Sequence, residues 1–266
     1  MHVSLKPVEH LLFETDLVLV ADFRCRPDDA LFRDSGPSNA NCIVFPSTCT
    51  KIIRPHGRTT FESPADVSFM NHGEEYRREA ISEEGTYSTW YTLNDDLLRE
   101  LLDGRGFAHP PRSIPARTIL EQRRLFAGIR SGAVLDSLAV EEKLISLTRM
   151  IVGTDGERTA VCPAVVERAT AYLLAHFSEP VSLSHVASAA GASVSYLSRA
   201  FHAATGMTMS AFRQRVRLTR SLDLLPQYDG NVTDLALELG YSSHSHFTAC
   251  FRTLFDMSPT EFLAGR

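Results

Sequence analysis

The sequence lacks the features that would indicate a membrane-spanning, secreted or zinc-dependent protein. No apolar run in its 266 residues approaches the ~20 that a membrane-spanning helix needs. The amino terminus also lacks a basic segment followed by an apolar one. The five cysteines are scattered and include no C-xx-C pair, which argues against a disulfide framework or a standard zinc site. We therefore expect a cytosolic protein.

An excess of positive charge is missing as well. The formal net charge is −5, and residues 163–266 contain as many arginines as aspartates plus glutamates, with no lysine. Nucleic-acid-binding proteins usually carry a basic surface, so any DNA binding here must depend on where the charges lie. The apolar content of 44% and the charged content of 22% are ordinary for a globular protein. The chain is long enough for two domains with separate cores.

The most informative feature of the sequence is an internal repeat over residues 181–262. The pattern L-xx-V-A-xx-A-G of residues 183–191 returns as V-xx-L-A-xx-L-G in residues 232–240. After each glycine comes a short turn and a second apolar pattern, in residues 193–201 and again in residues 243–251. A repeat of this kind indicates two copies of one supersecondary unit.

The spacing within each copy predicts a helix, a glycine turn and a second helix. The apolar residues that begin at Leu183 recur at i, i+3, i+4 and i+7, which places them in one stripe on a helix. Gly191 can adopt a positive φ and lets the chain turn sharply, while Ser193 suits the N-cap of the next helix. The pattern therefore predicts two helix-turn-helix units.

The second helix of each copy turns small or hydrogen-bonding side chains outward, as a helix in the DNA major groove requires. A plain helical bundle is the alternative for one unit, but matched spacing in two units favours DNA reading. Residues 240–247, together with Phe251-Arg252, Phe255 and Ser258-Pro259, resemble the signature of AraC/XylS-type transcription regulators. The resemblance covers about 100 residues.

The resemblance implies a seven-helix DNA-binding domain in which a joining helix, about residues 209–225, holds the two reading helices ~34 Å apart. It assigns Arg199 the clearest chemistry, because a guanidinium can bond guanine at two points. The base-facing positions that it implies are Val194, Ser195, Ser198, Arg199, His244, Ser245, His246 and Thr248. We expect four further arginines to contact DNA, namely Arg213, Arg217, Arg220 and Arg252.

The first part of the chain predicts a small β-barrel or jelly roll, so that the whole chain is of the α+β class. Many short strand-like runs alternate with turn residues between positions 16 and 91. The run from Met70 to Arg78 resembles the cupin-like effector domains of AraC-type proteins. The strand-like runs are residues 17–20, 42–45, 51–53, 67–70, 76–78 and 87–91.

Helical periodicity follows the strands. Helices are predicted at residues 97–102, after a cap at Asn94, and at residues 118–129 and 138–152. In the family such helices often carry dimer contacts, and the alternative is that they cover the barrel. The polar, glycine-rich stretch that follows indicates a linker. The predicted domains are 1–93 (barrel), 94–152 (helical, dimerisation), 153–162 (linker) and 163–266 (DNA binding).

An enzymatic barrel would need metal ligands that converge, and the sequence does not supply them. His56 and His72 are isolated, and His244 and His246 are two apart, so they do not share a helix face. We expect Trp90 to occupy the core or to line a pocket. We predict no catalytic residue, metal or cofactor, and expect Cys25, Cys42 and Cys49 to be buried.

Two alternative functions remain at this point, a helical protein-interaction module on a β-barrel and a cupin-type enzyme fused to a DNA-binding domain. The expected partner is double-stranded promoter DNA. Further expected partners are a small-molecule effector, a second copy of the chain and RNA polymerase, and the expected role is that of an activator.

Overall fold

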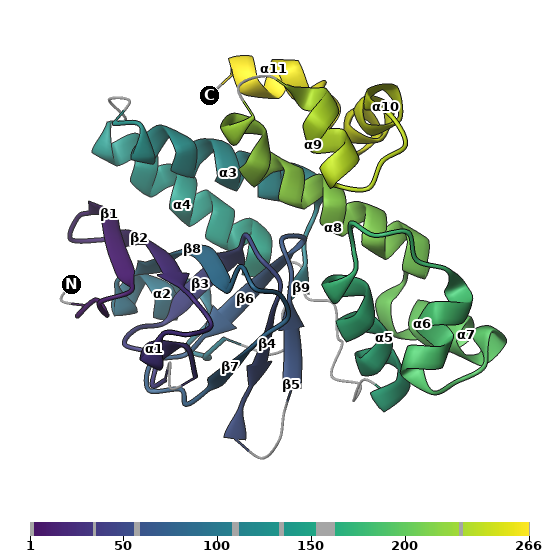
Figure 1. Ribbon diagram of the computed structural model, residues 1–266. Helices are drawn as coiled ribbons and strands as arrows, with labels where there is room; N and C mark the ends of the chain where they lie inside the picture. Colours follow the sequence, from purple (N-terminus) through teal and green to yellow (C-terminus); the bar gives the residue numbers. More distant parts are fainter. Residues whose placement is uncertain are drawn as a thin grey trace. The chain divides into compact units, whose positions relative to one another are not determined.

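The computed structural model consists of two compact units, Met1–Glu157 (unit 1) and Arg158–Arg266 (unit 2), each described here by itself (Figure 1). The predicted linker, residues 153–162, lies outside the described residues. The described residues are 3–33, 36–55, 59–107, 112–132, 136–152, 163–228 and 231–265.

The described strands of unit 1 form two antiparallel sheets, which confirms the α+β class. One sheet has six strands in the order β1-β2-β8-β3-β6-β9, and the other has three in the order β5-β4-β7. The strands are β1 (Glu9–Glu14), β2 (Val18–Cys25), β3 (Cys42–Pro46), β4 (Thr50–Ile53), β5 (Thr59–Glu62), β6 (Asp66–Met70), β7 (Arg77–Ala80), β8 (Thr86–Leu93) and β9 (Arg112–Ser113).

The two sheets share one apolar core. Phe23 of β2, Met70 of β6 and Trp90 of β8 come from the larger sheet, and Ile52 of β4 comes from the smaller one. Strand β2 is buried at every position except Arg24, because it lies between β1 and β8. The expectation that Trp90 belongs to the core is therefore confirmed.

The helices of unit 1 are α1 (Ala30–Arg33), α2 (Asp95–Leu101), α3 (Ala116–Arg130) and α4 (Ser137–Val152). The predicted cap is present, since the Asn94 side chain accepts a hydrogen bond from the backbone N–H of Leu97 at 2.9 Å. Figure 1 shows α3 and α4 lying together beside the larger sheet.

Buried polar contacts fasten these two helices to the sheet. Gln122 of α3 donates to the Thr89 hydroxyl of β8 at 2.8 Å, and the hydroxyls of Tyr91 and Thr148 lie 2.9 Å apart. These contacts favour the interpretation that the helices cover the sheet, and the prediction of dimerisation stays untested.

Each of the six predicted strand runs overlaps or adjoins a strand, but β1, β5 and β9 were not predicted. Strand β1 pairs with β2 through a register shift between Leu11 and Phe13, so its side chains do not alternate regularly along the sequence. Strand β9 has only two residues and follows two prolines, a context that sequence reasoning treats as a break.

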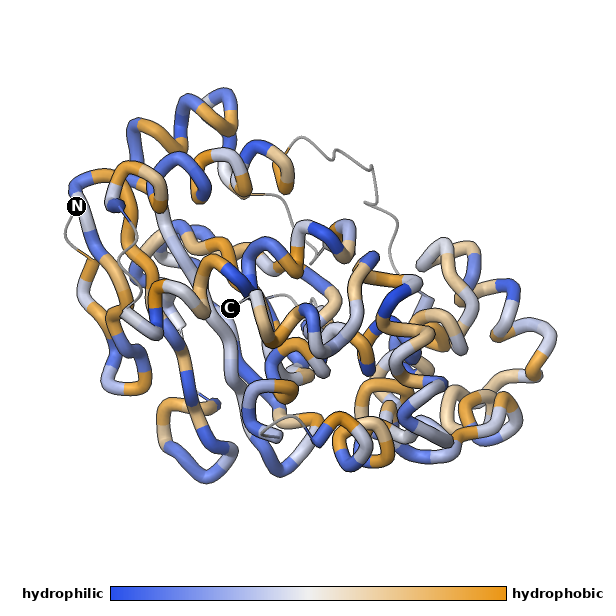
Figure 2. Tube along the Cα trace, turned by 90° about the horizontal axis from the view of Figure 1, so that it is seen from above, coloured by the Kyte–Doolittle hydropathy of each residue, from blue (hydrophilic) through white to orange (hydrophobic). Residues whose placement is uncertain are grey.

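Unit 2 is helical in its described residues, and apolar positions recur along its helices in Figure 2. None of the described helices in either unit combines the length and the apolar character that a membrane crossing demands. The helices of unit 2 are α5 (Ala164–Ala175), α6 (Leu183–Ala190), α7 (Val194–Thr205), α8 (Met209–Leu224), a 3-10 turn (Leu225–Gln227), α9 (Val232–Glu238), α10 (His244–Phe255) and α11 (Pro259–Ala264).

Each helix-turn-helix copy has its own core. In the first, α5, α6 and α7 meet around Val166, Ala187 and Phe201. Leu183 is 49% exposed, so its place in the apolar stripe was wrong, because it is the first residue of α6. In the second copy the core is aromatic, with the ring centroids of Phe251 and Phe255 4.7 Å apart.

Candidate nucleic-acid interface

The two copies begin their helices in the same way. The hydroxyl of Ser193 caps α7 by accepting from the backbone N–H of Tyr196 at 3.3 Å, and Ser243 caps α10 through His246 at 3.2 Å. The first helices carry equivalent caps, since Ser182 caps α6 and Asn231 caps α9. Each cap satisfies a backbone N–H that would otherwise lack a partner. The repeat in the sequence is therefore a repeat of local structure.

The turn glycines adopt the left-handed conformation that the sequence predicts, with φ of 66° at Gly191 and 78° at Gly240. Gly240 has a second constraint, because a Cβ atom there would lie 2.0 Å from the carbonyl oxygen of Ser178. At Gly191 the nearest atom, in the Arg168 side chain, would be 3.8 Å away. The second turn therefore tolerates only glycine, whereas the first has room for a methyl group.

The predicted base-facing residues of α7 lie on its accessible side. Val194, Ser195 and Arg199 are exposed, and Ser198 is half-buried. The Nε of Arg199 donates to the carbonyl oxygen of Ser195 at 3.3 Å, one turn earlier. This contact lays the arginine side chain along the outer face of the helix.

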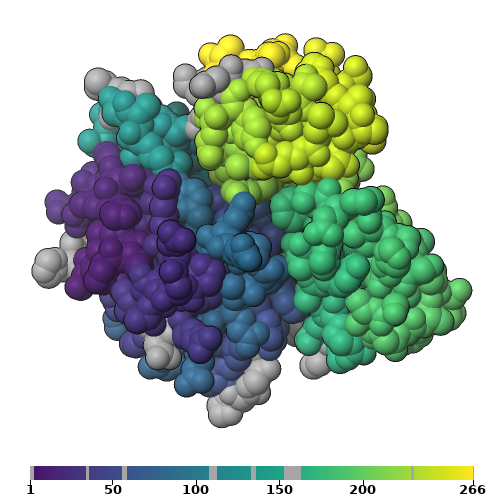
Figure 3. Space-filling view, viewed as in Figure 1, coloured from purple at the N-terminus to yellow at the C-terminus, as the bar shows by residue number. Residues whose placement is uncertain are grey.

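The corresponding residues of α10 are arranged similarly. His244, Ser245 and His246 are exposed, and Thr248 is half-buried. The Thr248 hydroxyl lies 3.3 Å from Nε2 of His244, so these two share a face one turn apart. His246 is held differently, because its Nδ1 lies 3.3 Å from the Ser242 hydroxyl. In Figure 3 both copies, the first in green and the second in yellow, reach the surface of unit 2.

Two of the predicted DNA-contacting arginines are buried. The guanidinium of Arg217 donates to the carbonyl oxygens of Phe177, Glu179 and Gly240. Its burial lowers the pKa of Arg217 to about 10, so the side chain stays charged at neutral pH. Arg220 is also buried, with 8% of its surface exposed. Their burial argues against a contact of either arginine with DNA, and the assignment of both to DNA stays an untested prediction.

Arg213 and Arg252 remain accessible. Arg252 is exposed in the last turn of α10, and Arg213 is half-buried and donates to the carbonyl oxygen of Glu179 at 3.2 Å. A cation at such a position can meet a phosphate without reading the base sequence. The assignment of these two arginines to DNA stays a prediction.

Tyr196 is a surface residue that sequence reasoning missed. It is 51% exposed near the start of α7, among the predicted base-facing residues. The repeat contained the signal, because fifty residues on it corresponds to His246, which was predicted. The phenol of Tyr196 can donate a hydrogen bond to DNA or accept one from it.

The described residues offer no assembled metal site. Within them, no three histidine, cysteine, aspartate or glutamate side chains are grouped to hold an ion, and His56 lies outside the described part of the chain. Cys25, Cys42 and Cys49 are buried, as expected. Burial raises the pKa of the Cys42 thiol to about 12, so it stays protonated and is a poor nucleophile or metal ligand.

Comparison with known proteins agrees with this geometry. A family model described as a helix-turn-helix domain matches residues 186–265. The transcriptional activator RhaS of Klebsiella pneumoniae is 30% identical over 156 residues, which cover 56% of each chain. RhaS of Salmonella schwarzengrund is 29% identical over 178 residues, covering 65% of this chain and 63% of that one. The chain thus spans less than two thirds of the length of these relatives, both named as transcriptional activators and not as enzymes.

Solved structures are also similar to parts of the chain. A transcriptional regulator from Chromobacterium violaceum with an AraC-type DNA-binding domain is 30% identical, covers 38% of this chain and 89% of its own, and has a TM-score of 0.36. ToxT from Vibrio cholerae is 12% identical over 98% of each chain, with a TM-score of 0.39. Neither superposition is close enough to carry an argument about this chain. Residues 186–265 thus match a helix-turn-helix domain and the longer matches are to transcriptional activators, in agreement with the AraC/XylS-type signature around Gly240.

Proposed function

We propose that the chain is a sequence-specific DNA-binding transcription regulator that reads two adjacent major-groove segments with α7 and α10. The observation that carries the proposal is the repeated, capped and exposed helix face. Both helices begin at a serine cap and present Ser195 and Ser245 at equivalent exposed positions. Polar side chains that project from a firmly anchored helix are what direct base reading requires.

The competing function for such helices is binding to a protein partner. Partner-binding helices usually present an apolar core to their target, with a polar rim. Of the eight predicted base-facing residues, only Val194 is apolar, and it is 37% exposed. This composition supports DNA over a protein partner, even though the formal charge of residues 163–266 is balanced.

Selection of bound sequences from random DNA with the whole protein tests the proposal. We expect one preferred site with two contacted segments separated by roughly one DNA turn, about 10 base pairs. Affinity for that site should fall as salt rises, because bound cations displace counterions from the phosphates. The proposal is contradicted if no sequence is enriched and all random duplexes bind with the same weak affinity.

The role and the partners of the whole protein are also part of the proposal. The names of the related activators support activation of transcription, for which we expect contact with RNA polymerase, and support a cytoplasmic location beside the chromosome. We assign effector binding to unit 1, which contains a pocket between its strands. We assign dimerisation to residues 94–152, where Leu138 and Met150 of α4 are exposed. The domain limits 1–93, 94–152, 153–162 and 163–266 are retained on these grounds.

A further inference from the structure

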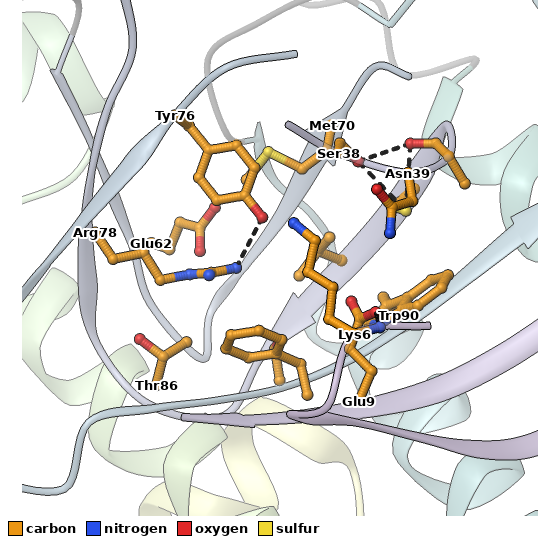
Figure 4. Close-up of a pocket in the computed structure, with 15 residues that line it drawn as sticks. Lys6, Glu9, Ser38, Asn39, Glu62, Met70, Tyr76, Arg78, Thr86 and Trp90 are labelled. Carbon is orange, nitrogen blue, oxygen red and sulfur yellow. Dashed lines mark hydrogen bonds between the residues drawn. The ribbon is translucent and has the colours of Figure 1, made fainter. Parts of the chain in front are cut away.

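Unit 1 contains a pocket whose walls come from both sheets. Phe23 of β2, Arg78 of β7 and Trp90 of β8 line it, and Lys6 lies across it (Figure 4). The free space in this partly open pocket is about 30 Å³, which suits a ligand of only a few non-hydrogen atoms. The flexible side chain of Lys6 can give way to a slightly larger one.

Arg78 is the unusual residue of this pocket. Its guanidinium lies 4.0 Å from the centre of the Phe23 ring and donates from Nη2 to the Tyr76 hydroxyl at 3.2 Å. The residue is only 8% exposed, and no described residue accepts a hydrogen bond from its Nε or Nη1. In Figure 4 the guanidinium points into the pocket. Buried N–H groups without an acceptor are rare, because each loses its hydration.

Trp90 presents a second donor of the same kind. It is 4% exposed, and its indole Nε1 has no acceptor among the described residues. The two acidic residues of the pocket are different, because each already has a donor. Glu62 accepts from the Ser68 hydroxyl at 2.5 Å, and Glu9 accepts from the backbone N–H of Lys6 at 2.7 Å. The buried side-chain atoms of the pocket that lack a hydrogen-bond partner among the described residues, on Arg78 and Trp90, are therefore all donors.

We infer that this pocket binds a small monocarboxylic acid, whose carboxylate accepts from Arg78 and which offers a further acceptor to Trp90. The inference rests on the proposed effector role of unit 1 and names the ligand class of that role. The planar guanidinium matches the carboxylate geometry, and the surrounding rings strengthen the contact by excluding water. Glu9 and Glu62 would repel a second carboxylate, so the ligand carries a single negative charge.

The test measures binding of propionate, lactate and pyruvate to the full chain, by thermal unfolding and calorimetric titration. We expect at least one of these acids to raise the unfolding temperature, because it binds only the folded state. The matched primary amides and the dicarboxylate succinate should raise it much less. If none of the three acids stabilises the protein more than its amide does, the inference is wrong.

Variants locate the site. Arg78→Met should weaken acid binding roughly tenfold or more, since a charge-assisted hydrogen bond is lost. Trp90→Phe keeps the ring and removes the donor, and should weaken binding of lactate and pyruvate more than that of propionate. Arg24→Met is the matched control, because Arg24 also stacks on a ring, that of Tyr87 at 4.3 Å, but is exposed on the surface. Equal losses in Arg78→Met and Arg24→Met would overturn the assignment.

Arg78→Lys keeps the positive charge. It shows whether Arg78→Met loses acid binding only because that variant misfolds. It should fold and retain weaker, charge-dependent acid binding, and full wild-type affinity in it would contradict recognition by the guanidinium. DNA affinity measured in the same samples separates this inference from the proposed function. DNA binding without acid binding refutes only the inference. Acid binding without any effect on DNA binding supports the site and refutes its role as an effector site.

Discussion

Arg199 and Arg217 of unit 2 differ in what their guanidinium groups can reach. Arg199 is exposed on α7, whereas Arg217 of α8 is 8% exposed and bonded to backbone carbonyls. Both fit a DNA-binding pattern in the sequence, because an arginine next to polar residues gives no sign of whether its helix face is covered. Burial therefore separates a residue that can contact DNA from one that holds the domain together.

Arg199→Ala should reduce affinity for the preferred DNA site by about 1–3 kcal/mol and relax the preference at one base position. The reason is that Arg199 can form two hydrogen bonds to guanine, whereas its counterpart Ala249 can offer only an apolar contact. Affinities for the selected site and for its single-base variants measure the effect. The stability of the protein should not change, because the side chain is exposed.

Two controls accompany this change. Ala249→Gly should leave base preference alone and cost roughly 1 kcal/mol in helix stability. Arg252→Ala should weaken binding to all sequences alike and flatten its salt dependence, as expected for a phosphate contact. If Arg199→Ala leaves the base preferences intact while Ala249→Gly alters them, the division of roles between the two helices is wrong.

Arg217→Ala should lower the free energy of unfolding by roughly 1–3 kcal/mol, because the carbonyls of Phe177, Glu179 and Gly240 lose their donor. Urea denaturation monitored by circular dichroism measures this change. Arg213→Ala is the matched control on the same helix. Arg213 is half-buried and donates to one described carbonyl, that of Glu179, so its replacement should lower the free energy of unfolding much less. If Arg217→Ala leaves the stability unchanged and reduces the salt dependence of DNA binding, Arg217 contacts a DNA phosphate and does not hold the domain together.

The helices of unit 2 were largely predictable because their signals are local. A cap such as Ser193 and a turn glycine such as Gly191 act within a few residues, so the sequence displays both cause and effect. Edge strands such as β1 were not predictable, because their pairing depends on a distant partner and on a register shift. The buried face of α8 was missed for a similar reason, since what covers it comes from residues 177–179 and 240.

The turn of the second copy should be much less tolerant of substitution than the first. Gly191→Ala places a methyl group at φ 66° without a clash and should cost about 1–2 kcal/mol. Gly240→Ala adds a clash with the backbone of Ser178 and should cost roughly 3 kcal/mol or more. Chemical denaturation of the two variants makes the comparison. Equal losses would mean that the approach to Ser178 does not constrain the turn.

The candidate sites of the whole molecule differ in how far sequence could find them. The eight base-facing residues were named from the repeat and the family signature, and all lie at exposed or half-buried positions. Tyr196 was missed although the repeat pairs it with His246. The pocket of unit 1 was beyond sequence reasoning, because Arg78 and Trp90 line it from two different sheets that share one core.

The division into two units predicts that residues 158–266 fold and bind the selected DNA without unit 1. The core around Val166, Ala187 and Phe201 lies entirely within this fragment. A shorter fragment, residues 180–266, lacks α5 and should lose most of its helical circular dichroism, because Ala169 and Leu173 no longer cover the first copy. If the shorter fragment folds as well as the longer one, α5 is dispensable. If the longer one shows no helical signal, unit 2 depends on unit 1 for its stability.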